Sequence, residues 1–142
     1  MFILDTNVIS EAMRLEPEPA VMAWLDDQDA LDLYVTTVSL GEVEYGLRRL
    51  PFGARRSRLE GNLEKLLAET FSGRVLSFDQ PAATYYGQVM SRRRALGRPI
   101  FALDAQIAAI ARVARFAIAT RNVRDFVECG VEIVNPFERS RS

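Results

Sequence analysis

The sequence predicts an α/β fold in which helices flank a central, mainly parallel sheet of about five strands. Short apolar segments alternate along the chain with longer segments of helical periodicity. This alternation is typical of parallel sheets covered by helices. The expected strands are residues 2–4, 33–36, 75–78, 117–119 and 131–134. The expected helices lie near residues 19–28, 39–50, 55–70, 80–96 and 103–115.

Loop residues and apolar spacing support the individual elements. Proline and glycine in "PEP" at 17–19 and in "GRP" at 97–99 mark loops. The helix near 39–50 has one apolar face, formed by Leu40, Val43, Leu47 and Leu50. Residues 1–142 are expected to form a single domain, whose polar tail at 136–142 frays.

Composition excludes several classes of protein. Hydrophobic residues make up 49% of the chain and charged residues 26%, which is a globular rather than a disordered balance. The sequence lacks an apolar run of the roughly 18 residues that a membrane-spanning helix needs. Cys129 is the only cysteine. An internal disulfide is therefore impossible, and we expect a cytoplasmic protein.

The chain contains no histidine, and this excludes much catalytic chemistry. Serine and cysteine nucleophiles activated by histidine are ruled out, and a zinc site would lack its usual nitrogen and sulfur ligands. An enzyme of this composition has carboxylates, hydroxyls, amides and arginines to work with. Carboxylates without imidazole or thiolate favour hard cations such as Mg2+ or Mn2+.

A carboxylate stands at the end of the first expected strand. In "FILDTN" the apolar residues run directly into Asp5, Thr6 and Asn7. Open parallel sheets bind their ligands beyond the carboxyl ends of the strands, so Asp5 is a candidate site residue. The alternative is that Asp5 only caps the helix that follows.

A second carboxylate lies in "FALDAQIAAIARVAR", where the helix is expected to begin near Leu103. Asp104 falls on the same helix face as Ile107, Ala108 and Ala111. A charge on a packed face is costly unless it is paired or bound to a metal. A first-turn acid also meets the positive end of the helix dipole, but this explains a surface aspartate better than an inward one.

Glu42 is the third candidate, and two roles are open for it. Glu42 flanks the apolar face of its helix, whereas Glu44 can pair with Arg48 one turn on. Ser39 followed three residues later by a glutamate is also the pattern of a capping box. Glu42 can therefore serve the site, the helix start, or both.

Basic residues are concentrated in the later part of the chain. Residues 1–44 hold ten acids and one base, whereas residues 45–142 hold nine acids and seventeen bases, all but Lys65 arginine. The guanidinium group matches phosphate oxygens, which favours nucleic-acid contact. Solvated helix faces are the alternative. The arginines selected for RNA contact are Arg92, Arg93, Arg94, Arg98 and Arg121.

Four segments together resemble PIN-domain proteins, in particular the VapC and FitB-like toxins of toxin–antitoxin pairs. These segments are "ILDTNVISE", "SLGEVEYGL", "ALDAQIAAIA" and "IATRNVRDF", followed by "VNPF". The resemblance covers nearly the whole chain in the family's order and spacing. It implies a PIN-like three-layer sandwich and a Mg2+- or Mn2+-dependent endoribonuclease. It also implies an RNA substrate, a cognate antitoxin partner and a homodimer, with no membrane association.

The resemblance also implies site residues. The family's acidic positions correspond to Asp5, Glu42 and Asp104, with Asp5 and Asp104 holding the metal and Glu42 as a further ligand or water-orienting group. Thr6 and Asn7 would orient Asp5 or a water molecule. The family's fourth acid corresponds to Asn122, so that either Asn122 or Asp125, one turn further on, completes the site.

Two other functions remain open at this stage. The chain can be a non-catalytic PIN-fold binding module, for which the missing acid at Asn122 is the only support. It can also be an aspartyl-phosphate or receiver-like enzyme. Such an enzyme needs a second aspartate beside Asp5 and a well-placed lysine, and "DTN" lacks the former while Lys65 lies in a helical segment.

Overall fold

The computed structural model describes residues 1–138 and contains a five-stranded parallel sheet with strand order β3-β2-β1-β4-β5. The predicted α/β class and parallel sheet are confirmed. The strands are β1 (Phe2–Leu4), β2 (Leu33–Thr36), β3 (Val75–Leu76), β4 (Ala117–Ala119) and β5 (Ile133–Val134).

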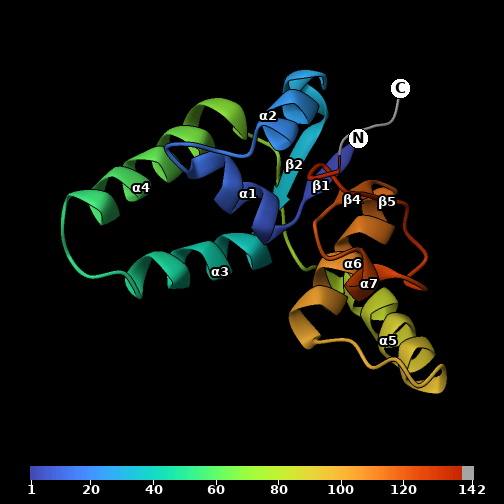
Figure 1. Ribbon diagram of the computed structural model, residues 1–142. Coiled ribbons are helices and arrows are strands. Elements are labelled where there is room, and N and C mark those ends of the chain that lie inside the picture. The colour runs from blue at the N-terminus through green and yellow to red at the C-terminus, as the bar shows by residue number, and fades with distance from the viewer. Residues whose placement is uncertain (139–142) are drawn as a thin grey trace.

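Helices cover both faces of the sheet, so the fold is a three-layer sandwich (Figure 1). Helices α1 to α4 lie on one side, and α5 to α7 lie on the other. The helices are α1 (Thr6–Met13), α2 (Pro19–Asp26), α3 (Thr37–Arg48), α4 (Ala54–Lys65), α5 (Gln80–Ala95), α6 (Ala102–Ala114) and α7 (Val123–Phe126). Along the described chain, each helix falls short of the length and apolar character needed to cross a membrane.

The alternation of side chains along the strands divides the core in two. Successive residues of a strand point to opposite faces of the sheet. In β1, Ile3 packs on the α5–α6 side, whereas Leu4 packs on the α1–α4 side. In β4, Ile118 packs on the α5–α6 side and Ala119 packs on the α1–α4 side. All four side chains are at most 2% exposed, so β1 and β4 form the centre of the molecule.

The edge strands β3 and β5 are shorter than expected, at 2 residues each. The expected strand 75–78 stops at Leu76, which pairs with Thr36, the last residue of β2. The expected strand 131–134 is reduced to Ile133–Val134, which pair with the last two residues of the short strand β4. The expected helix 55–70 changes to π-helical hydrogen bonding over Leu66–Thr70. Helices α1 and α7 are absent from the expected helix ranges.

The capping box predicted at Ser39 is wrong. Helix α3 begins two residues earlier than expected, and its N-cap is Thr36, whose Oγ1 accepts a hydrogen bond from the Ser39 amide at 3.1 Å. Ser39 is thus already inside the first turn. Its own hydroxyl is buried and has no hydrogen-bond partner. Glu42 is therefore released from the capping role that the sequence pattern suggested.

The packed part of the chain extends further than predicted. Pro136, inside the tail expected to fray at 136–142, is fully buried, and Phe137 packs against the core on the α1–α4 side. The Arg121 guanidinium lies over the Phe137 ring at 3.8 Å from its centroid. Residues 139–142 of that predicted tail lie outside the described residues.

The position of the α3 cap is tested by a matched pair of substitutions. We expect Thr36→Val, which keeps the side-chain volume but removes the accepting oxygen, to lower the free energy of unfolding by about 0.5–2 kcal/mol. Ser39→Ala removes a hydroxyl that has no partner and should change it by less than about 0.5 kcal/mol. Urea unfolding of both variants measures this. A larger loss for Ser39→Ala would restore the capping box.

Candidate active site

The candidate site lies where β1 and β4 end, at the carboxyl edge of the sheet. Asp5 follows β1 directly, is 4% exposed, and its amide donates to the Ala119 carbonyl of β4 at 2.9 Å. Its extended backbone makes it the N-cap of α1. The capping role and the site role predicted for Asp5 are therefore compatible, because one carboxylate oxygen suffices for the cap.

Three donors fix the Asp5 carboxylate. Oδ1 accepts from the Thr6 amide at 2.8 Å, and Oδ2 accepts from Asn7 Nδ2 at 3.1 Å and from Thr120 Oγ1 at 2.7 Å. Burial raises the pKa of Asp5 above its ordinary value of 3.8. These three hydrogen bonds oppose that shift, and the negative charge of Asp125 adds to it.

Thr120 is a site residue that the sequence analysis did not select. Its fully buried hydroxyl donates to Asp5 and accepts from Asn7 Nδ2 at 3.3 Å and from the Asn122 amide at 3.0 Å. The hydrogen-bonding capacity of a hydroxyl is then filled. Asn7 extends the network, since its Oδ1 accepts from the Arg121 amide at 3.0 Å. Thr120 follows β4 directly, the same signal that identified Asp5 after β1.

Glu42 is tied to the same edge by a side chain that the sequence placed beside Asp5. Thr6 Oγ1 donates to Glu42 Oε1 at 2.9 Å. Thr6 thus contacts two acids: its amide binds Asp5 and its hydroxyl binds Glu42. The bond to Glu42 joins the start of α1 to the middle of α3, and it uses only the Oε1 oxygen of Glu42.

Asp104 lies in the first turn of α6 with its carboxylate half-buried, and the next turn is packed, with Ile107 and Ala108 fully buried. Burial raises the pKa of Asp104 from 3.8 to about 6, and the negative charges of Asp5, Asp125 and Glu42 add to this effect. The charge of Arg93 opposes it. The structure therefore brings Asp5, Glu42 and Asp104 within electrostatic reach of one another.

Of the two residues predicted to complete the site, Asp125 is the one whose charge acts on the other acids. The charge of Asp125 raises the pKa of both Asp5 and Asp104. Asn122 is exposed and precedes α7, and its side chain makes no capping hydrogen bond. Asn122 contributes through its backbone amide, which donates to Thr120.

The five arginines predicted to contact RNA have different environments. Arg93 is 5% exposed and donates to backbone carbonyls, so the prediction of RNA contact for Arg93 is wrong. Arg92 is exposed but pairs with Glu128 at 2.6 Å. Arg94 and Arg98 are exposed, and Arg121 is exposed at the carboxyl edge of β4. Three of the five thus remain candidates for RNA contact.

The donor set fits a hard divalent cation that keeps part of its water shell. Within residues 1–138, no group of three Asp, Glu, His or Cys side chains is arranged to hold a metal ion by itself. Mg2+ seldom uses an all-protein cage and commonly takes one or two carboxylates together with waters. Asp5 and Asp104 are the two acids whose burial and mutual repulsion a bound cation would relieve.

Comparisons with known proteins agree with this architecture. Residues 2–130 match the PIN domain. The plasmid stability protein StbB of Pseudomonas syringae pv. tomato is 41% identical over 97% of this chain and 99% of its own length. The VapC ribonuclease Y4jK of Sinorhizobium fredii is 39% identical with the same two coverages.

A solved structure extends the likeness to three dimensions. The crystal structure of FitAcB from Neisseria gonorrhoeae superposes with a TM-score of 0.90 at 37% identity, over 97% of this chain and 99% of that chain. This chain belongs to the PIN-domain family, among the proteins of VapC and FitB type.

The raised pKa of Asp104 predicts a pH-dependent effect of Asp104→Asn on the metal-free protein. The folded state favours the neutral form of Asp104. The free energy of unfolding of the wild type therefore falls as the pH rises from 3.8 to about 6, and the whole loss persists at higher pH. A half-buried group feels only part of such a cost, so we expect Asp104→Asn to raise the free energy of unfolding at pH 7.5 by about 1 kcal/mol.

The same comparison at pH 4 should give a smaller gain, since wild-type Asp104 is then largely neutral. Urea unfolding in EDTA at the two pH values measures the difference. Glu44→Gln, at an exposed acid on α3, is the matched control. A loss of stability for Asp104→Asn at pH 7.5 would contradict the electrostatic assignment.

Proposed function

We propose that the protein is a metal-dependent endoribonuclease toxin that hydrolyses RNA phosphodiester bonds and is inhibited by a cognate antitoxin. The observation that carries the proposal is a set of four acids at the carboxyl edge of the sheet, in which the charges of Asp5, Glu42 and Asp125 all act on Asp104. Membership of the PIN-domain family and the likeness to a VapC ribonuclease support RNA as the substrate.

Asp5 and Asp104 are the residues that would hold Mg2+ or Mn2+. A divalent cation bound there supplies Lewis acidity toward the phosphate and lowers the pKa of water. Thr6, Asn7 and Thr120 orient the Asp5 carboxylate before any ligand arrives, because their donors occupy defined lone pairs. Such preorganisation avoids the cost of rearranging charged groups during the reaction.

Glu42 and Asp125 would act on the attacking water. Glu42 is held by Thr6 through Oε1, so its other oxygen can accept a hydrogen bond from water. Attack of that water on phosphorus breaks the bond to the ribose 3′ oxygen and leaves a 5′-phosphate and a 3′-hydroxyl. The water would give its proton to a carboxylate, since the chain offers no imidazole. The departing 3′ oxygen would take up a proton from solvent water.

Exposed arginines would contact the RNA backbone. Arg121 follows Thr120 directly, and its guanidinium is stacked on Phe137. The stacking restricts the side chain, so less conformational entropy is lost when it binds phosphate. Arg94 and Arg98 offer further exposed charges at the end of α5 and in the loop after it.

A protein partner fits the distribution of exposed apolar side chains. Phe52 is 90% exposed, Phe101 81% and Tyr45 67%. Single exposed apolar residues are normal, but side chains of this size often mark surfaces that a partner covers. The family resemblance supplies the partners, which are an antitoxin and a second copy of the chain.

Cleavage of a fluorescent RNA by the purified protein tests the activity. We expect cleavage with Mg2+ or Mn2+ and none with EDTA. Asp5→Asn and Asp104→Asn should each lower kcat at least 100-fold or so, since both remove a charge that would hold the cation. Glu44→Gln is the control, because it removes an exposed acid outside the site. Metal-independent cleavage, or equal activity of all variants, would exclude the mechanism.

Binding of the cation is tested separately, without RNA. Mn2+ should raise the melting temperature of the wild type, because a ligand that binds only the folded state stabilises it by about 2.7 kcal/mol at 100 times its Kd. The double variant Asp5→Asn with Asp104→Asn should show no such rise. Differential scanning fluorimetry measures both. An equal rise in the double variant would place the cation elsewhere on the protein.

A further inference from the structure

Arg93 is a buried cation whose role the activity described above does not explain. It lies in α5 between Arg92 and Arg94, both of which are exposed, yet Arg93 itself is only 5% exposed. Successive helix residues are separated by about 100°, so consecutive arginines face different directions. A buried guanidinium must find hydrogen-bond partners to offset its lost hydration.

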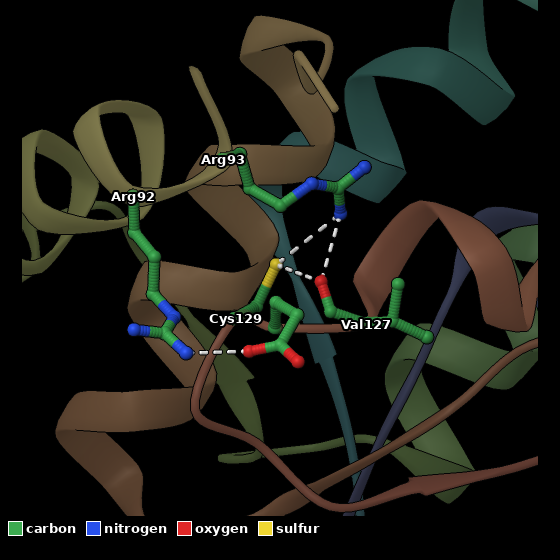
Figure 2. Close-up of polar contacts among 5 residues, drawn as sticks. Arg92, Arg93, Val127 and Cys129 are labelled. Carbon is green, nitrogen blue, oxygen red and sulfur yellow. Dashed lines mark hydrogen bonds and ion pairs between the residues drawn. The ribbon is translucent and has the colours of Figure 1, made fainter. Parts of the chain in front are cut away.

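The partners of Arg93 are backbone carbonyls. Nε donates to the Arg98 carbonyl at 2.6 Å, and Nη1 donates to the carbonyls of Asp125 at 2.8 Å and Val127 at 3.0 Å. Nη1 also approaches Cys129 Sγ at 3.8 Å. Figure 2 shows the contacts to Val127 and Cys129 beneath the guanidinium. Arg93 thus binds the backbone at the end of α7 from a helix more than thirty residues earlier in the sequence.

The fully buried Phe126 side chain anchors this segment, but among the described residues its terminal carbonyls have few other donors, and Cys129 Sγ lies at 3.6 Å from the Val127 carbonyl. Helix α7 is only four residues long, and the chain leaves it through an extended Val127 and a left-handed Glu128 at φ 60°. The last carbonyls of any helix lack partners within the helix, and a cation placed there satisfies them and complements the helix dipole. Arg93 does both for the carbonyls of Asp125 and Val127.

We propose that Arg93 is a positioning residue that holds Asp125 within the acidic site. The inference rests on the proposed function. Arg93 binds the main chain of Asp125 itself, so the direction of the Asp125 carboxylate depends on this contact. Arg92 acts differently, since it pairs with the side chain of Glu128 at the surface (Figure 2).

A double-mutant cycle between Arg93 and Asp125 tests the proposal. We expect Arg93→Met to lower kcat for RNA cleavage at saturating Mn2+ by about 10–100-fold, as is usual for groups that orient ligands. KM for RNA should change by less than about threefold, because Arg93 is too buried to contact substrate. Asp125→Asn should lower kcat to a similar extent. The kcat of the double variant should lie within about twofold of the kcat of Asp125→Asn, because the two changes remove the same function.

Two further variants separate positioning from general stability. Arg92→Met, at the exposed neighbour, should leave kcat within about twofold of the wild type. Arg93→Lys keeps a charge and a donor and should be less impaired than Arg93→Met. Hydrogen exchange of the amides over residues 123–128 should be faster in Arg93→Met and unchanged in Arg92→Met.

Several outcomes would overturn the proposal. These are additive losses in the cycle, a wild-type kcat for Asp125→Asn, an Arg93→Lys variant no better than Arg93→Met, or failure of both Arg93 variants to fold. If the wild type itself cleaves no RNA, the proposed function fails instead. Hydrogen exchange then decides alone, and unchanged exchange over residues 123–128 in Arg93→Met would overturn the positioning role.

Discussion

Asp5 is only 4% exposed at the end of the central strand β1, and the neighbouring elements are arranged so that they accommodate its charge. A buried carboxylate is tolerated only where donors surround it. Those donors come from the first residues of α1 and from Thr120 after β4. β1, α1 and β4 are therefore fixed relative to one another by polar bonds as well as by packing.

The hydrogen bonds to Asp5 do not fully offset the effect of burial on its pKa, and this residual shift bears on function. The pKa of Asp5 stays raised despite three donors, and Asp104 lies nearby with a pKa of about 6. A sequence selected for stability alone would replace one of these acids. Acids that repel one another at the carboxyl edge of the sheet instead indicate a site that binds a positively charged group. A divalent cation bound there would remove the repulsion, and its binding would recover the stability that the repulsion costs the metal-free fold.

The sequence predicted the parts of the site that depend on local pattern. Asp5 ends a short apolar strand, and Asp104 starts a strongly apolar helix, so both could be found from neighbours within one turn. Thr36 and Ser39 show the limit of this reasoning: both fit a cap, and the choice depended on β2 ending one residue before the helix. Thr120 also follows an apolar strand directly, but its contact with Asp5 depends on β4 lying beside β1, which is a property of the sheet order.

The arginines show why composition alone could not assign a role to each residue. "SRRR" reads as a single basic cluster, but on a helix its members face different surroundings. One guanidinium satisfies buried carbonyls, one pairs with a glutamate, and one is exposed. Arg93 is the buried member because the carbonyls of Asp125 and Val127 lie beside it and accept its hydrogen bonds. The charge pattern predicted RNA contact for all three arginines, whereas the tertiary contacts distinguish the buried Arg93, which serves the fold, from its exposed neighbours.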